Sequence, residues 1–184
     1  MDGDALKYQA FWCEENIWHL AQHPTTSADE ALVLAVTGTL GQVACWQQKA
    51  AEEGEAVVWD YHVVLATKTV TCWQIWDLDT RLGMPVSART WMDETFPYPE
   101  FVPPEFHPRF AVFDTASYVK GLNSDRSHMR TDTETWLKTP PSWSAIRGDG
   151  LGLLVLPIAL AVMVTLIVYK AGQRHLPKRL RSKR

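Results

Sequence analysis

The spacing of hydrophobic and polar positions along the chain predicts one short helix near the N-terminus. In residues 13–21, Ile17, Leu20 and Ala21 recur at helical spacing. Two glutamates follow Cys13 in the first turn, where the helix dipole favours acidic side chains. We therefore predict a helix that begins near Cys13.

Strand-like runs follow this helix. The clearest is AVVWDYHVVLAT, residues 56–67, in which Val, Trp and Tyr dominate. A second run covers residues 70–76, and residues 67–69 are enough to join the two as an antiparallel hairpin. Shorter apolar runs predict strands at residues 31–36 and 110–113.

The other segments are less regular. Residues 43–46 are ambiguous, and residues 47–54 read as a loop or a short helix. Residues 85–108 are rich in Pro and aromatic side chains, which predicts an ordered but irregular surface loop. A short helix is predicted at residues 115–122. The whole pattern indicates an α+β fold built on an antiparallel sheet.

A different pattern marks the C-terminus. Residues 151–169 contain no charged side chain, and as a helix they would span roughly 28 Å, close to the hydrocarbon core of a bilayer. Residues 170–184 form a basic tail. We predict a transmembrane helix or an aberrant hydrophobic helix here, and a buried core helix is the alternative.

Composition narrows the classes of function. Of 184 residues, 46% are hydrophobic and 21% charged, which is typical of a folded domain. The basic tail holds seven of the 18 Lys and Arg residues, so the rest of the chain carries a net charge of −10. Such an acidic body argues against binding of nucleic acid. The three cysteines include no Cys-x-x-Cys pair, which argues against a disulfide framework and a structural zinc site.

Three side chains suggest nucleophilic chemistry. Cys13 lies at a helix N-terminus, where the dipole stabilises a thiolate. His62 lies in the middle of one predicted strand and Asp77 at the end of the next, so the hairpin brings them within one or two rows. A carboxylate beside a histidine orients the ring and stabilises its protonated form. A buried Cys, a core His and a turn-forming Asp are the ordinary alternatives.

Four short motifs, in order along the chain, resemble the protein N-terminal glutamine amidohydrolase family. They are CEENIW (13–18), WDYHVVL (59–65), DLDT (77–80) and SDRSHM (124–129). The resemblance runs from about Tyr8 to Ile146 and breaks after it, which gives a domain at residues 1–148. It implies a papain-like or transglutaminase-like fold with the catalytic Cys at a helix N-terminus.

The same resemblance implies an activity and a catalytic set. The family converts an N-terminal Gln of a protein to Glu and releases ammonia, without a metal or cofactor. The catalytic residues would be Cys13, His62 and Asp77. Asp79, Cys45 and Cys72 are expected to be structural.

Selectivity for a terminal Gln requires a group that recognises the free α-amino group. Acidic side chains do this, and Glu15, Asp60 and Asp125 are the candidates. Trp18 and Tyr61 are the candidates for the walls of the substrate pocket. A helix cap, a turn, a solvated surface or core packing is the alternative for each of them.

The expected partners are proteins or peptides that expose an N-terminal Gln, and the Glu product is what arginyl transfer in the N-degron pathway uses. We expect a monomer in the cytoplasm, with the nucleus as a further site, or a membrane-anchored enzyme with a cytosolic catalytic domain if residues 151–169 are a genuine anchor. Two other functions stay open. One is a transglutaminase-like amidase of other specificity, and the other is a tail-anchored adaptor with an inactive domain.

Overall fold

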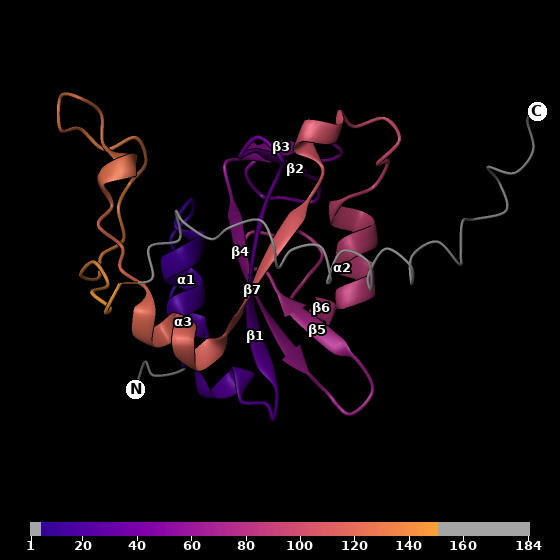
Figure 1. The fold of residues 1–184 in the computed structure, drawn as a ribbon, viewed down its shortest axis with the longest axis horizontal. Helices are drawn as coiled ribbons and strands as arrows, with labels where there is room; N and C mark the ends of the chain where they lie inside the picture. The colour runs from indigo at the N-terminus through magenta and orange to yellow at the C-terminus, as the bar shows by residue number, and fades with distance from the viewer. Residues whose placement is uncertain (1–4, 151–184) are drawn as a thin grey trace, which may run out of the picture.

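The computed structural model describes residues 5–150, which form a five-stranded antiparallel sheet with helices on both faces (Figure 1). The order of strands is β6-β5-β4-β1-β7. Two further strands, β2 and β3, pair in a small separate sheet. The strands are β1 (Ala31–Thr37), β2 (Val43–Cys45), β3 (Val57–Trp59), β4 (His62–Lys68), β5 (Trp73–Trp76), β6 (Val86–Ser87) and β7 (Arg109–Asp114).

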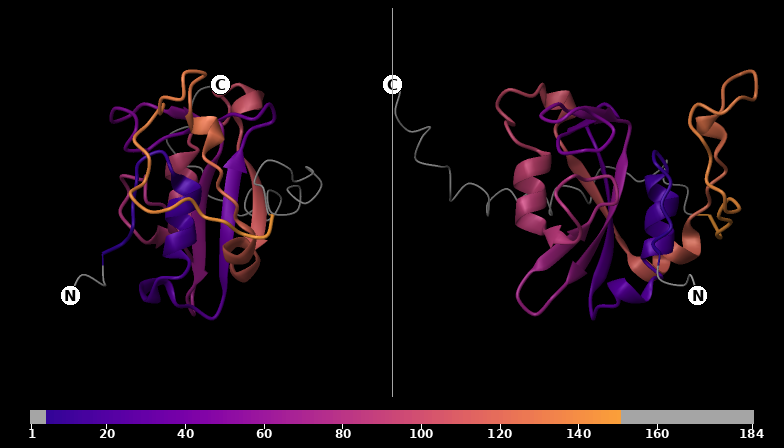
Figure 2. Two further views of the ribbon diagram at one scale, coloured as in Figure 1. Left: turned by 90° about the vertical axis from the view of Figure 1, so that its left-hand side faces the viewer. Right: turned by 180° about the vertical axis from the view of Figure 1, so that it is seen from behind.

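Helices α1 (Cys13–Leu20) and α3 (Thr115–Gly121) lie on one side of the large sheet, and α2 (Ala88–Thr95) lies on the other (Figures 1 and 2). Three single turns of 3-10 helix complete the regular structure: η1 (Pro24–Thr26), η2 (Pro104–Phe106) and η3 (Ser127–Met129). The prediction of an α+β fold with an antiparallel sheet is confirmed.

Two hydrophobic cores, one on each face of the sheet, hold the layers together. Successive side chains of a strand point to opposite faces, so β4 contributes to both cores. Val63 and Leu65 pack in the core that contains Ile17 of α1. Val64 and Ala66 pack in the core that contains Trp91 of α2. Burial on both faces explains why β4 reads as a continuous apolar run.

The register of β4 against β5 places two polar residues at one end of the sheet. Leu65 pairs with Trp76 and Lys68 with Trp73, so the start of β4 lies beside the end of β5. His62 is the first residue of β4, and Asp77 directly follows β5. The predicted hairpin is therefore confirmed, although its connection is residues 69–72 rather than 67–69.

Two of the predicted elements are wrong in their extent. The run at 56–67 is not one strand, because β3 pairs with β2 and the chain turns at residues 60–61 before β4 joins β1. Residues 85–108 are not irregular throughout. They contain α2, whose first turn is capped by Ser87, the acceptor for the backbone N–H of Thr90 at 3.0 Å.

The segment after α3 returns along α1 and is fastened to it (Figure 1). The indole of Trp143 donates to Glu15 of α1 at 2.7 Å, and the indole of Trp12, directly before α1, donates to the carbonyl of Thr139 at 2.9 Å. Residues 151–169, the candidate membrane segment, lie outside the described residues. Within residues 5–150, every helix is too short or too polar to cross a bilayer.

The core next to α1 provides a test of this packing. Ile17 is 1% exposed, and we expect Ile17→Ala to lower the free energy of unfolding by about 2–5 kcal/mol because it leaves a cavity. Leu40, which is 79% exposed in a turn, is the matched control, and Leu40→Ala should change it by less than about 0.5 kcal/mol. Urea unfolding measures both. Equal losses in the two variants would contradict this description of the core.

Candidate active site

A buried histidine and a buried aspartate form the centre of the site. The Nε2 atom of His62 lies 2.9 Å from Oδ1 of Asp77, and each residue is 1% exposed. The pair is positioned by the β4–β5 hairpin, because His62 begins the first strand and Asp77 follows the second. The expectation that His62 lies in the middle of a strand is wrong, since β3 and β4 separate just before it.

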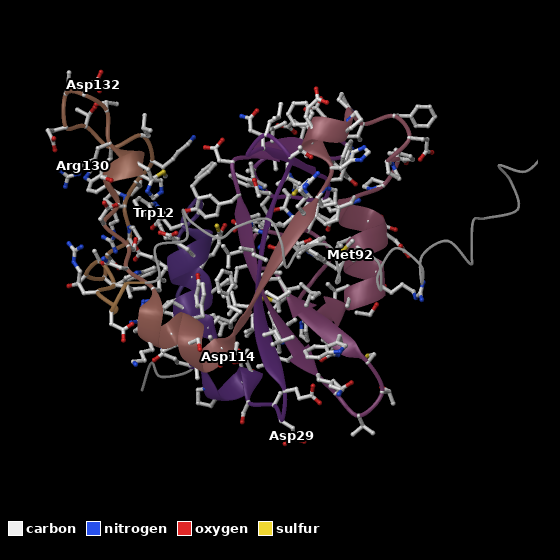
Figure 3. The ribbon with its side chains drawn as sticks, viewed as in Figure 1. Trp12, Asp29, Met92, Asp114, Arg130 and Asp132 are labelled. Atoms are coloured by element: carbon white, nitrogen blue, oxygen red, sulfur yellow. The ribbon has the colours of Figure 1, made fainter. Side chains whose placement is uncertain are left out.

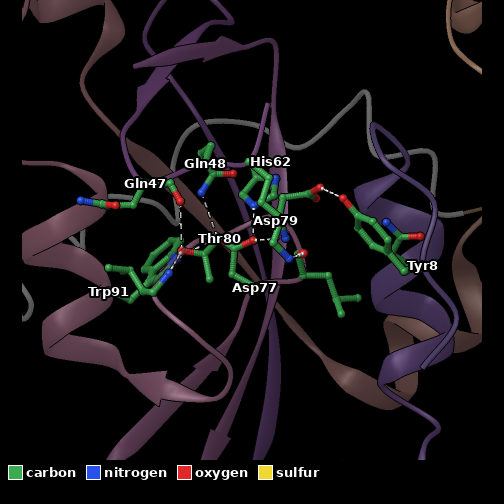
Figure 4. A network of polar contacts seen from close by, with 12 residues as sticks. Tyr8, Gln47, Gln48, His62, Asp77, Asp79, Thr80 and Trp91 are labelled. Atoms are coloured by element: carbon green, nitrogen blue, oxygen red, sulfur yellow. Dashed lines mark hydrogen bonds and ion pairs between the residues drawn. The ribbon is translucent and has the colours of Figure 1, made fainter. Parts of the chain in front are cut away.

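Three further donors hold the Asp77 carboxylate (Figure 4). Oδ2 accepts the indole N–H of Trp91 at 3.0 Å and the amide of Gln48 at 3.2 Å. Oδ1 also accepts the backbone N–H of Asp79 at 3.0 Å. Burial raises the pKa of Asp77, but His62 and these donors outweigh burial, so the pKa is lowered. Asp77 is therefore held as an anion.

The charge of Asp77 controls the basicity of the His62 imidazole. Burial lowers the pKa of His62, but the charge and hydrogen bond of Asp77 outweigh it, so the pKa is raised well above its usual value. The indole of Trp59 stacks on the imidazole, with ring centroids 5.9 Å apart and planes 15° apart. Asp77 uses Nε2, which leaves Nδ1 as the ring nitrogen for a second partner.

The thiol of Cys13, the first residue of α1, interacts with His62. Its side chain is partly exposed. Burial raises the pKa of the thiol, and interaction with His62 opposes this. Phe11, two residues earlier, has a φ of 71°, a left-handed conformation that is rare for a bulky residue. Cys13, His62 and Asp77 thus form a thiol–imidazole–carboxylate series from two separate parts of the fold.

Asp79 lies close to His62 and Asp77. Its carboxylate accepts the hydroxyl of Tyr8 at 2.7 Å, and burial raises its pKa (Figure 4). Ligand-type atoms of His62, Asp77 and Asp79 lie within 4.8 Å of one another. Because His62 and Asp77 bond directly, their facing atoms are already used, and the group fits a hydrogen-bond network better than a metal site.

Glu15 makes a buried ion pair. It is fully buried and accepts two bonds from the guanidinium of Arg126, at 2.7 and 2.6 Å. The hydroxyl of Ser124 and the indole of Trp143 donate to it as well, each at 2.7 Å. Burial raises the pKa of Glu15, but these partners outweigh it and the pKa is lowered. Its oxygens are fully occupied by internal partners.

The remaining candidates for substrate binding occupy different places. Trp18 packs at the core and donates to the carbonyl of Val119 at 2.8 Å. Asp60 is exposed in the turn before β4, and Asp125 is exposed and bonded to its neighbour Ser127.

Tyr61, which precedes His62, bonds to the residue that follows Cys13. Its hydroxyl donates to Oε2 of Glu14 at 2.8 Å. Sequence reasoning missed Glu14, and it missed the roles of Gln48 and Trp91 at Asp77. The motif WQQKA, residues 46–50, contains Gln48 and is the one signal that could have pointed to it.

An apolar hollow of about 490 Å³ lies against the small sheet formed by β2 and β3. Its lining includes Ala44 and Val58 from β2 and β3, and Tyr98, Phe101 and Phe106 from the segment after α2. None of the three residues of the thiol–imidazole–carboxylate series lines it. The hollow therefore contains none of the chemistry described above.

Replacing Asp77 should change the titration of His62 in a defined direction. In Asp77→Asn, burial is no longer opposed by a negative charge, so the pKa of His62 should fall below about 6.5, whereas in the wild type it lies above that value. NMR titration of the imidazole measures it. Trp91→Phe removes only one donor to Asp77 and should move the pKa less. An unchanged pKa in Asp77→Asn would contradict the assigned cause.

Removing one partner from the buried ion pair of Glu15 and Arg126 should destabilise the fold strongly. Arg126→Met leaves the buried charge of Glu15 without a cationic partner, so we expect a loss of about 3–5 kcal/mol in the free energy of unfolding. The double variant Arg126→Met with Glu15→Gln removes both charges, so its free energy of unfolding should fall by less. In the wild type this contribution is present above the unfolded pKa of Glu, about 4.3, and is lost as the pH falls through the lowered folded pKa. Urea unfolding at pH 7 and at lower pH tests both statements.

The chain is similar to known proteins of one family. A family model described as N-terminal glutamine amidase matches residues 8–153. The protein N-terminal glutamine amidohydrolases of Bos taurus and Homo sapiens are 35% and 34% identical to the chain over 152 residues, which cover 79% of this chain and 73% and 74% of theirs. That of Danio rerio is 30% identical over 150 residues, 78% of this chain and 74% of its own. The chain therefore belongs to the N-terminal glutamine amidase family.

Proposed function

We propose that the protein is a hydrolase that deamidates the N-terminal Gln of proteins to Glu and releases ammonia. The observation that carries this proposal is the series Cys13–His62–Asp77, found in a member of the N-terminal glutamine amidase family. A thiol paired with a histidine that is oriented by a carboxylate is the arrangement needed to attack an amide carbon.

In the first half of the reaction, His62 accepts the thiol proton while Sγ of Cys13 attacks the side-chain carboxamide carbon. Asp77 stabilises the imidazolium that forms. The negative charge that develops on the amide oxygen needs hydrogen-bond donors, and the first N–H groups of a helix have no intrahelical acceptor. The N–H groups of Cys13 and Glu14, at the start of α1, supply them.

In the second half, His62 returns its proton to the departing nitrogen, and the C–N bond breaks to give ammonia and a thioester on Cys13. His62 then removes a proton from a water molecule that attacks the thioester carbon. The C–S bond breaks, Glu is released, and the thiol is regenerated with the proton from His62. The overall change is the amide plus one water giving a carboxylic acid plus ammonia, so no oxidant, metal or cofactor is needed.

The catalytic core is of the papain-like or transglutaminase-like type in this proposal, with the nucleophile at the first residue of a helix. The substrates are proteins with an exposed N-terminal Gln, and the Glu product is suited to arginyl transfer in the N-degron pathway. We place the activity in the cytoplasm and expect a monomer. Membrane association through residues 151–169 stays a prediction. Family membership favours this function over a transglutaminase-like amidase or an inactive adaptor.

Replacement of the nucleophile tests the proposal. The wild-type chain should convert a peptide that begins with Gln into a product about 1 Da heavier and release ammonia, because O–H replaces NH₂. Cys13→Ser should lose at least about 10³-fold in turnover, since the hydroxyl is a weaker nucleophile at its usual pKa. Cys72→Ser, which changes an exposed cysteine in the β4–β5 connection, is the control and should keep full activity. Mass spectrometry follows all three, and activity retained in Cys13→Ser would refute the mechanism.

A further inference from the structure

The described part of the site contains more buried negative charge than buried positive charge. Four carboxylates, each less than a tenth exposed, lie on α1 and directly after β5: Glu14, Glu15, Asp77 and Asp79. Two bases buried to the same extent face them, His62 and Arg126. An ionised carboxylate without a partner is costly to bury, and burial raises the pKa of both Glu14 and Asp79. A cationic ligand would stabilise either of them as an anion.

Three of the four acids have a cationic neighbour in the protein. Arg126 binds Glu15 with two hydrogen bonds. Asp77 bonds to His62, and the charges of His62 and Lys49 partly offset the burial that raises the pKa of Asp79. These contacts satisfy the acids without any substrate.

Glu14 differs from the other three. Its exposed fraction is 7%. One oxygen accepts the hydroxyl of Tyr61 at 2.8 Å, and the other lies 3.0 Å from the hydroxyl of Ser124, whose single proton lies closer to Glu15, at an oxygen–oxygen distance of 2.7 Å. Among residues 5–150, no Lys or Arg forms an ion pair with it. Burial raises the pKa of Glu14, and its hydroxyl partners and the charge of the exposed His128 offset this only in part, while Glu15 raises the pKa further. Glu14 is thus the carboxylate left for a cation from outside.

Glu14 is also placed where the substrate must be. It follows Cys13 in α1, its charge acts on the Cys13 thiol, and its partner Tyr61 precedes His62. In an extended glutamine, four bonds separate the side-chain amide carbon from the α-nitrogen, which is roughly 5 Å. Cys13 interacts with His62 and Glu14 bonds to Tyr61, the residue before it, so the thiol and the carboxylate both face the start of β4 and can engage the two ends of a terminal glutamine.

We propose that Glu14 binds the α-ammonium group of the first residue of the substrate, with Tyr61 and Ser124 holding its carboxylate in place. This inference rests on the proposed function and names the group that makes the site selective for a chain terminus. An internal Gln has a neutral amide nitrogen at the same position, which would leave the carboxylate of Glu14 buried and unpaired. The site would therefore disfavour an internal Gln as well as favour a terminal one.

Binding to a variant without the nucleophile tests this proposal separately from the chemistry. In the Cys13→Ala background, a short peptide with a free N-terminal Gln should bind more tightly than its N-acetylated form. Glu14→Gln should weaken binding of the free peptide at least about 30-fold, as expected for one lost partner of a desolvated charge pair, and leave the acetylated peptide unchanged. Glu53→Gln, an exposed acid between β2 and β3, is the matched control and should change neither.

Two further measurements exclude a merely structural effect. With Cys13 present, Glu14→Gln should not slow the alkylation of the thiol by the neutral reagent iodoacetamide, because the charge of Glu14 raises the pKa of Cys13 and its loss favours the thiolate. If Glu14→Gln does not fold, Tyr61→Phe, which removes one hydroxyl from Glu14, should weaken binding of the free peptide several-fold and leave the acetylated peptide unchanged.

The outcomes separate the two proposals. Equal binding of the free and acetylated peptides to the Cys13→Ala protein overturns the role of Glu14. So does loss of the preference in Asp79→Asn with retention in Glu14→Gln, which would assign the ammonium site to Asp79. If the preference depends on Glu14 but the wild-type chain deamidates no Gln peptide, the binding site stands and the proposed function fails.

Discussion

The carboxylate of Asp77 is the point on which the site depends. Its four hydrogen bonds join β4, the loop that contains Gln48, the helix that contains Trp91 and the backbone of Asp79. A buried anion needs such partners, and once they are present it fixes the orientation and the basicity of His62. The sheet, α2 and the loop at residues 46–50 therefore all help to position the imidazole of His62. Figure 3 shows how densely side chains fill the space between these elements.

Sequence reasoning found the parts of the site that local patterns encode. The β4–β5 hairpin followed from two β-branched and aromatic runs, and it placed His62 near Asp77 correctly. The break between β3 and β4 was missed because WDYH continues the same run without Gly or Pro. Helix α2 was missed because prolines dominate the segment that contains it, although Ser87 is an ordinary helix cap.

Long-range polar contacts account for the rest of what was missed. Glu15 was a candidate for substrate binding, and nothing near it in the sequence reveals that Arg126, 111 residues away, binds its carboxylate. In the sequence, Glu14 and Glu15 are two adjacent glutamates of one predicted helix, and nothing distinguishes them. They differ in the structure because one faces a guanidinium and the other faces two hydroxyls. Pairing of charges is a property of the folded chain, and only the fold distinguishes these two glutamates.

The ion pair of Glu15 also sets an order of events during synthesis. Helix α1 leaves the ribosome first, but Arg126 and Trp143, which complete the surroundings of Glu15, follow 111 and 128 residues later. Contacts that close such long loops form only after the intervening chain is available. These contacts of the helix that contains Cys13 therefore form late in folding. A nascent or prematurely ended chain has the thiol but lacks these partners of Glu15, so the polar surroundings of the helix are complete only in a chain that extends past Trp143.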